Sequence, residues 1–133
     1  MPTLNIGQKA TRTQTITDEM IRTFAALTGD SNPVHLDDAF AATTRFGRRI
    51  AHGMLAASLI SAALANDLPG PGTVYLSQSI QFKAPVFPGD TITAIIEVKS
   101  IRNDKPIAIL TTICVNQENV TIIEGEAAVL MSN

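Results

Sequence analysis

Apolar and polar positions divide the chain into a helical first half and a strand-rich second half. In the first half, one apolar stripe at helical spacing is formed by Met20, Ile21, Phe24 and Leu27. Thr17 is a favourable N-cap for this helix, and Gly29 is a favourable residue to end it. The pattern therefore predicts a first helix between Thr17 and Gly29.

A second, more apolar helix is predicted over His52 to Asn66. Apolar residues surround its axis almost completely, which is typical of a buried helix. Its many alanines and serines allow neighbouring elements to approach closely. A shorter helix is expected at Asp37 to Thr43.

The remaining segments have the alternation and turn signals of strands. The predicted strands are Gln8 to Ile16, Thr73 to Ala84, Thr91 to Ile101, Pro106 to Asn116 and Val120 to Met131. Shared faces are expected for Ile92, Ala94, Ile96 and Val98, and for Ile107, Ile109, Ile113 and Val115. Because the connections are short and polar, neighbouring strands should run antiparallel.

These elements predict an α+β protein with a single domain over residues 1–133. The simplest assembly is a five-stranded antiparallel sheet curled around the buried helix of small residues, which is a hot-dog architecture. Such a sheet leaves exposed strand edges, so we expect a homodimer formed through an edge strand.

Composition and charge narrow the classes of function. Apolar residues make up 45% and charged residues 17%, as in a core-rich globular domain. The net charge is −2 and no segment is strongly basic, so nucleic-acid binding is not expected. A small anion remains a possible ligand for the cationic residues Arg45, Arg48, Arg49 and Lys83.

The chain shows no sign of a membrane or export segment. The longest apolar candidate, Ile50 to Leu68, is too short and too polar to span a bilayer. The N-terminus lacks the basic and apolar blocks of a signal peptide. The single cysteine, Cys114, lies in an apolar run and is expected to be a buried thiol. We therefore expect a soluble cytoplasmic protein with no membrane partner.

Asp30 and His35 are the best candidates for chemistry. Gly29 and Pro33 force irregular backbone on either side of Asp30, and Asn32 precedes a proline and is pushed out of the helical region. Five residues of bent chain can bring the carboxylate and the imidazole to one water molecule, where they can remove a proton and return one elsewhere. Taken alone, Asp30 is better explained as a capping or turn aspartate and His35 as a loop histidine, and only their joint pattern favours chemistry.

The segment from Phe24 to Ala41 resembles the signature of the R-specific enoyl-CoA hydratases, the MaoC-like or hydratase 2 family. The matching elements are Phe24, Leu27-Thr28-Gly29-Asp30, Asn32-Pro33-Val34-His35 and Ala41; Ile50-Ala51-His52-Gly53-Met54, Phe82-Lys83-Ala84-Pro85-Val86 and Pro88-Gly89-Asp90 resemble later parts of the family. The resemblance implies a hot-dog homodimer with an overhanging N-terminal helical segment. It also implies reversible hydration of trans-2-enoyl-CoA to (R)-3-hydroxyacyl-CoA by Asp30 and His35, without a cofactor, as in short members that serve polyhydroxyalkanoate synthesis.

Further site residues follow from the buried helix and from the resemblance. Gly53 lies in its first turn, where a free backbone N–H can polarise the thioester carbonyl, although close packing alone also explains a glycine. Supporting roles beside the catalytic pair are expected for Asn32, His52 and Ser61. Leu64 and Val129 can meet at the far end of an acyl tunnel, which would favour short acyl chains, but both are equally compatible with ordinary core packing.

Two other functions fit parts of the pattern. A hot-dog thioesterase would direct water at the carbonyl carbon, and Asp30 could serve it, but His35 would then lack a purpose. A non-catalytic acyl-thioester binding module would bind without turnover. No metal site is expected, because two histidines and scattered carboxylates match no familiar ligand spacing.

Overall fold

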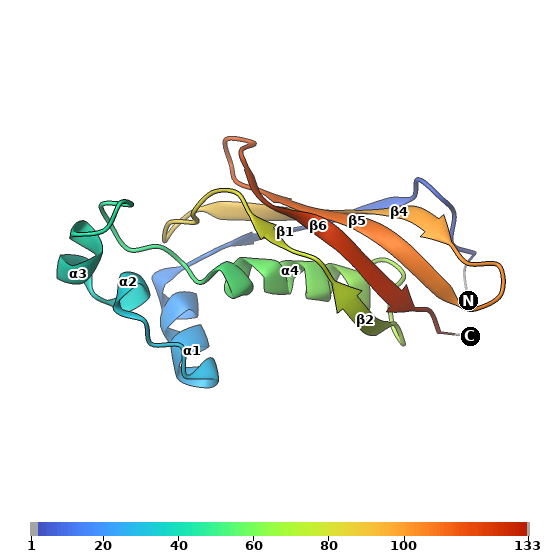
Figure 1. Ribbon diagram of the computed structural model, residues 1–133, viewed down its shortest axis with the longest axis horizontal. Helices are drawn as coiled ribbons and strands as arrows, with labels where there is room; N and C mark the ends of the chain where they lie inside the picture. The colour runs from blue at the N-terminus through green and yellow to red at the C-terminus, as the bar shows by residue number, and fades with distance from the viewer. Residues whose placement is uncertain (1–2, 133) are drawn as a thin grey trace.

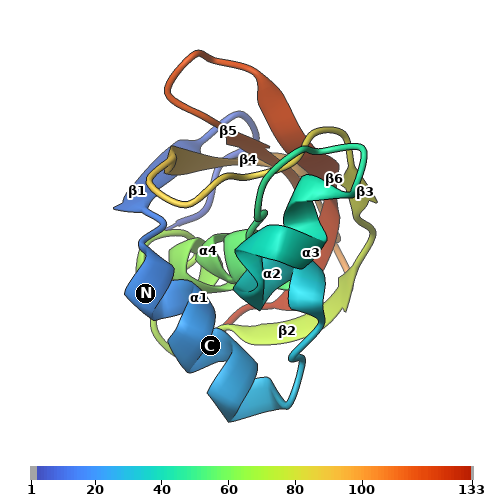
Figure 2. The same ribbon diagram turned by 90° about the vertical axis from the view of Figure 1, so that its left-hand side faces the viewer.

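An antiparallel sheet curls along one long helix, and three short helices lie beyond one end of it (Figure 1). The computed structural model describes residues 3–132. The central helix is α4 (Gly53–Asn66), and the outer helices are α1 (Asp18–Thr28), α2 (Pro33–Leu36) and α3 (Asp38–Ala42). Seen along α4, the strands curl around the helix (Figure 2). This is the predicted hot-dog architecture with an overhanging helical segment.

The sheet contains six strands and is antiparallel throughout. The strands are β1 (Lys9–Thr15), β2 (Val74–Gln78), β3 (Gln81–Phe82), β4 (Thr91–Ile101), β5 (Ile107–Val115) and β6 (Thr121–Leu130). Their order is β1-β4-β5-β6-β2, and β3 also pairs with β6. The two edges of the sheet therefore belong to β1 and to the β2–β3 segment.

The expected count of five strands was wrong by one, because the segment predicted from Thr73 to Ala84 is divided into β2 and β3. Both halves pair with β6, at Gln78 with Ala127 and at Gln81 with Glu124. Between them, the backbone of Ser79 passes very close to Gly125. A Cβ atom on Gly125 would lie 1.8 Å from the Ser79 carbonyl oxygen. The close approach explains both the glycine and the interruption of the strand.

The first helix has the predicted boundaries but a narrower apolar stripe. Thr17 Oγ1 accepts a hydrogen bond from the Met20 N–H at 3.1 Å, and Gly29 ends the helix in the left-handed conformation at φ 81°. Ile21 is buried, but Leu27 is 81% exposed, so its expected place in the stripe was wrong. Leu27 lies in the last turn, beyond the end of the sheet, where described residues of this chain leave it uncovered.

The core lies between α4 and the inner face of the sheet. On β4 the inner face is the predicted set of Ile92, Ala94, Ile96 and Val98. On β5 the buried set is instead Ala108, Leu110, Thr112 and Cys114. The isoleucines that share the other face of β5 are only half-buried, because the curl of the sheet turns that face away from α4.

One face of α4 is not covered by the sheet. Met54 is 57% exposed, and Ser58, Ser61 and Ala65 are also exposed. These four positions recur at intervals of three or four residues, so they form a single strip along the helix. The expectation that α4 is buried all round therefore holds for this chain only on its other faces.

Two further expectations concern Cys114 and membrane spans. The Cys114 side chain is buried against α4, with Sγ 3.9 Å from the Ala56 carbonyl oxygen. Burial raises the pKa of the Cys114 thiol to about 12, as expected for an inert core cysteine. Between residues 3 and 132, no helix combines the length and hydropathy needed to cross a bilayer.

Replacing Gly125 with alanine tests the close approach that interrupts the sheet. The added Cβ atom meets the Ser79 backbone, so Gly125→Ala should lower the free energy of unfolding by about 3 kcal/mol, as overpacking of a rigid site does. The control is Gly47→Ala, which adds its methyl group where nothing lies within 4 Å and loses only about 1 kcal/mol for its positive φ of 72°. Urea denaturation measures both, and equal losses would contradict the steric explanation.

Candidate active site

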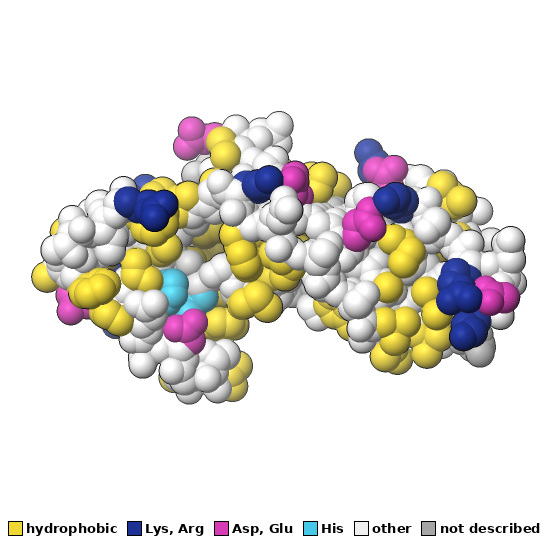
Figure 3. All heavy atoms as spheres, viewed as in Figure 1, with side chains coloured by type: hydrophobic (Ala, Val, Ile, Leu, Met, Phe, Trp, Pro, Cys, Tyr) yellow, Lys and Arg dark blue, Asp and Glu magenta, His cyan; other side chains and the backbone are white. Residues whose placement is uncertain are grey.

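A cavity of about 510 Å³ opens between the overhanging helices and the N-terminal end of α4. Asp30 and His35 line it, together with parts of the segments 45–54 and 82–86. The volume is in the range of small-molecule binding sites. Figure 3 shows the two histidine side chains of the chain at the bottom of a hollow, with apolar side chains around them. The structure thus brings the two predicted catalytic residues into one cavity.

Asp30 is held on a short loop between α1 and α2. Its backbone N–H donates to Thr28 Oγ1 at 3.2 Å, and one carboxylate oxygen accepts from the Asn32 N–H at 3.4 Å. Asn32 in turn caps α2, because its side-chain oxygen accepts from the Val34 N–H at 3.2 Å. The supporting role predicted for Asn32 therefore has a geometric basis, since its cap sets where α2 begins. The Asp30 carboxylate keeps acceptor capacity toward the cavity.

His35 is presented to the cavity by α2 and is oriented by one backbone hydrogen bond. Its Nδ1 atom lies 2.8 Å from the Ile50 carbonyl oxygen. A carbonyl oxygen only accepts, so Nδ1 carries the hydrogen and donates it. In the neutral ring, Nε2 then holds the free lone pair. His35 is 8% exposed, so little of the ring is lost to bulk water.

His52 connects the two candidate residues. Its Nε2 atom donates to the Asp30 backbone carbonyl at 2.9 Å, and its ring lies 3.9 Å from that of His35 between centroids. On its other side it contacts the Phe24 ring at 4.8 Å. His52 is 2% exposed, and its Nδ1 atom has no hydrogen-bond partner among the described residues. Its predicted role as a brace agrees with these contacts.

Gly53 is the first residue of α4 and lines the cavity. Within the described chain its N–H has no acceptor, as expected for the first turn of a helix. A Cβ atom here would lie 2.6 Å from Cε1 of Phe82, so close packing also favours glycine. Both explanations offered by the sequence are therefore compatible with the structure, and the oxyanion role stays a prediction.

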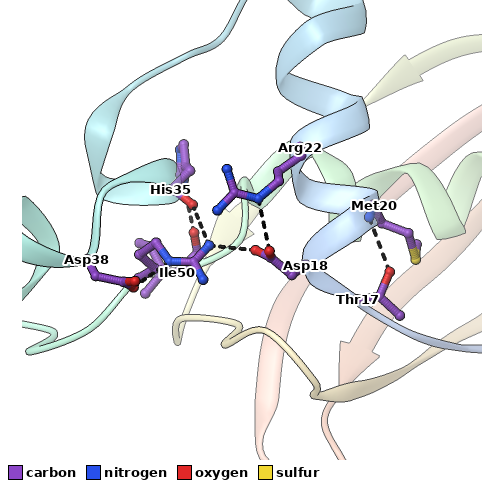
Figure 4. Close-up of polar contacts among 8 residues, drawn as sticks. Thr17, Asp18, Met20, Arg22, His35, Asp38 and Ile50 are labelled. Carbon is purple, nitrogen blue, oxygen red and sulfur yellow. Dashed lines mark hydrogen bonds and ion pairs between the residues drawn. The ribbon is translucent and has the colours of Figure 1, made fainter.

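Arg49 ties the overhanging helices together beside the site. It contacts Asp18 of α1 at 2.5 Å and Asp38 of α3 at 2.7 Å. It also donates to the His35 carbonyl of α2 at 3.3 Å (Figure 4). The Arg49 side chain is only 15% exposed, so these contacts are less screened than ordinary surface pairs. One side chain thus links the three helices that carry or border the candidate residues.

The ion pairs of Arg49 shift the pKa values of Asp18 and of Arg49 itself. The hydrogen bond from Arg49, and then that from Arg22, lower the pKa of Asp18 below its usual value of 3.8. The same bond to Asp18, and then that to Asp38, raise the pKa of Arg49. Because the folded pKa of Asp18 is lowered, its stabilising contribution is present above pH 3.8 and is lost as the pH falls through the lowered value.

The remaining predicted residues do not lie with the acid–base pair. Ser61 is two turns along α4 from Gly53 and lines a second cavity of about 450 Å³, between α4 and β2. Met54 lines both cavities. Leu64 and Val129 are 2% and 0% exposed and line neither. Their predicted effect on acyl length, like the supporting role of Ser61, stays a prediction.

The structure also gathers possible metal donors that the sequence spacing did not suggest. Asp30, His35 and His52 each place one potential ligand atom within 4.8 Å of the others. The separations come from the fold, because His52 is 17 positions after His35. All three residues also line the candidate cavity.

Several contacts at the site carry no sequence signal. The Ile50 carbonyl that orients His35 belongs to the backbone, which any residue supplies. The stacking of His52 on His35 and the contact of Phe82 with Gly53 join segments far apart in the chain. Phe24 is the exception. Its aromatic side chain is part of the first motif, and it could have suggested the ring contacts with His52.

The chain is similar over most of its length to several known proteins. The model of the family described as MaoC like domain matches residues 3–119. The (R)-specific enoyl-CoA hydratase of Aeromonas caviae is 52% identical over 95% of this chain and 94% of that protein. The 3-hydroxybutyryl-CoA dehydratase of Methylorubrum extorquens is 43% identical over 95% of this chain and 80% of that protein. A solved structure, the (R)-hydratase from A. caviae involved in PHA biosynthesis, has a TM-score of 0.95 at 50% identity and covers 99% of this chain and 100% of that one.

The ion pair of Asp18 predicts a pH-dependent contribution to stability. Asp18→Asn should lower the free energy of unfolding at pH 7, by at most about 1 kcal/mol because the carboxylate is exposed. The difference from the parent protein should begin to shrink below pH 3.8 and should disappear as the pH falls through the lowered pKa of Asp18, where the folded parent also loses the charge. Denaturation at several pH values measures it. Glu118→Gln, a residue without an ion pair between residues 3 and 132, is the control, and an acid-independent difference for Asp18→Asn would contradict the assignment.

Proposed function

The chain belongs to the MaoC-like domain family, and on that premise we propose that it catalyses the reversible hydration of trans-2-enoyl-CoA to (R)-3-hydroxyacyl-CoA. It is therefore a hydro-lyase acting on thioesters. The observation that supports this best is the common cavity of Asp30 and His35, two acid–base groups on adjacent elements. The stereochemistry and the CoA thioester follow from the similarity to named hydratases.

Asp30 and His35 bind and activate one water molecule in this proposal. The carboxylate accepts one hydrogen of the water, and His35 accepts the other at Nε2, because its Nδ1 is committed to Ile50. With both hydrogens held, a water lone pair faces C3 of the enoyl group. One of the two groups then takes the water proton as the C3–O bond forms.

The electrons of the double bond move toward the thioester carbonyl as water attacks. The resulting enolate oxygen needs a hydrogen-bond donor. In this proposal the donor is the Gly53 N–H at the start of α4, which has no acceptor among residues 3–132. The positive end of the helix dipole adds to it. A proton then returns to C2, which restores the carbonyl and leaves the acid–base pair in its starting state.

We expect a preference for short acyl groups. Leu64 of α4 and Val129 of β6 are buried and belong to the main core. If the acyl chain extends in this direction, their bulk limits its length. We therefore propose crotonyl-CoA as the first substrate to assay.

We also propose a homodimer formed through β2. The opposite edge, β1, is polar, with Lys, Arg and Thr side chains. In contrast, β2 exposes three consecutive apolar residues, Val74, Tyr75 and Leu76, at 51%, 39% and 49%. This apolar edge lies beside the uncovered face of α4 and the second cavity. A second copy paired there would cover the strand edge and the helix face together.

Removing either acid–base group should strongly reduce turnover without unfolding the protein. Asp30→Asn and His35→Gln should each lower kcat for crotonyl-CoA by about 100-fold to 10,000-fold, the range for general acid–base catalysis. Loss of the enoyl absorbance measures turnover, and circular dichroism checks the fold. Asp104→Asn, in the exposed hairpin between β4 and β5, is the matched control and should remain active.

The same assay separates the proposal from a thioesterase. Hydration removes the enoyl absorbance without releasing free CoA thiol, whereas hydrolysis releases thiol in equal amount. Thiol release by the parent protein, or full activity in both site variants, would contradict the proposal.

The edge strand predicts the oligomeric state. Replacing Val74 and Leu76 together with lysine should shift the protein from dimer to monomer, because two charges must be desolvated at each copy of the interface. Light scattering after size exclusion measures the mass. Val120→Lys, which changes an equally exposed apolar residue in the turn before β6, should leave the mass unchanged. A parent protein that is monomeric at micromolar concentration would exclude this interface.

A further inference from the structure

The four cationic residues considered as anion ligands in the sequence differ in how far other protein groups already bind them. They are Arg45, Arg48, Arg49 and Lys83. Arg49 is committed to Asp18 and Asp38, and its side chain is only 15% exposed. Arg48 lies over the ring of Phe87, 3.7 Å from its centroid, and does not line the catalytic cavity. Arg49 is thus committed to protein groups, and Arg48 lies outside the cavity.

Arg45 and Lys83 both line the catalytic cavity and approach it from different elements. Arg45 follows α3, and Lys83 follows β3. Arg45 is exposed and has neither an ion pair nor a side-chain hydrogen bond among residues 3–132. Lys83 has a single ion pair, with Glu124 at 3.3 Å, in which both side chains are nearly half exposed.

We propose that Arg45, assisted by Lys83, binds the phosphate groups carried by the pantetheine arm of the thioester substrate. The inference rests on the proposed function, because it assigns the part of that substrate which does not react. Figure 3 shows Lys or Arg side chains above the hollow that contains the histidines, on the side away from the acidic group below it.

The chemistry of the arm requires such a site. The thioester carbon must reach Gly53 and the acyl group must reach Asp30 and His35, so the arm leaves the cavity in the direction of solvent. The arm itself is neutral, and its first charge is the phosphate at its far end. A guanidinium presents several N–H donors to phosphate oxygens and stays charged at all working pH values.

The distribution of negative charge favours Arg45 as the main contact. Glu124 already neutralises part of the Lys83 charge and would compete with a phosphate for it. The carboxylate that lines the cavity itself, that of Asp30, lies at the acid–base site. Arg45 therefore offers the least compensated positive charge in the wall of the cavity.

Binding of saturated thioesters tests the proposal without any turnover. Calorimetry compares butyryl-CoA with S-butyryl-pantetheine, which lacks phosphate, for the parent protein and for Arg45→Ala. The variant should bind butyryl-CoA roughly 3-fold to 10-fold more weakly, as expected for one partly exposed ionic contact. Its affinity for the phosphate-free ester should change much less. The Kd for S-butyryl-pantetheine divided by the Kd for butyryl-CoA should therefore fall.

The matched control is Arg102→Ala, which removes the same charge from the hairpin between β4 and β5 at the opposite end of the molecule (Figure 1). It should leave the ratio of Kd values unchanged. An unchanged ratio of Kd values in Arg45→Ala would overturn the proposal. An equal fall of this ratio in Arg45→Ala and Arg102→Ala would also overturn it, because the effect would then reflect only the net charge of the protein. Rising ionic strength should also weaken butyryl-CoA binding more steeply in the parent protein than in Arg45→Ala.

A third ester identifies which phosphate is bound. If butyryl-4′-phosphopantetheine loses as much affinity as butyryl-CoA, Arg45 contacts the phosphate that is shared by CoA and by carrier-protein substrates. If only butyryl-CoA loses affinity, the contact is with the phosphates of the nucleotide. Because butyryl esters have no double bond to hydrate, these results stand apart from the crotonyl-CoA assay, whose failure would end the proposed function alone.

Discussion

The position of His52 is the constraint on which the candidate site depends. Its ring donates a hydrogen bond to the Asp30 backbone and stacks on the ring of His35, while its backbone begins α4. The loop, the short helix α2 and the start of the central helix are therefore held relative to one another through a single side chain. Its buried Nδ1 atom lacks a partner in the described chain, a condition that typically costs about 1–3 kcal/mol. Favourable packing against Phe24 and His35 offsets part of this cost.

Arg49 holds the three overhanging helices relative to one another. These helices lie beyond the end of the sheet, and they reach the main core through Ile21 and the partly buried Met20, Phe24 and Leu36. Arg49 reaches α1, α2 and α3 from a side chain that is mostly shielded from solvent. Because its bond to α2 is made at the His35 carbonyl, the same contacts that stabilise the segment also limit the movement of the imidazole.

Two cavities border α4 at different positions along the helix. At its N-terminus, Gly53 and the acid–base pair share one cavity, and farther along, the open face with Ser61 lines another. Met54 lies between them and lines both. The proposed partner subunit and the uncovered strip of α4 therefore lie on the side of the second cavity, whereas Arg45 and Lys83 line the first cavity.

Much of the architecture could be predicted because it depends on local patterns. Helical spacing and caps located α1 and α4, and alternation located β4 and β5, since these signals arise within a few neighbouring residues. The motif around Asp30 and His35 likewise identified both acid–base candidates. Tertiary structure alone decided which face of β5 is buried, where the segment from Thr73 to Ala84 breaks, and that Leu27 is exposed. It also placed His52, Ile50 and Arg49 around the site, because contacts between distant segments depend on how the sheet curls, which no local pattern encodes.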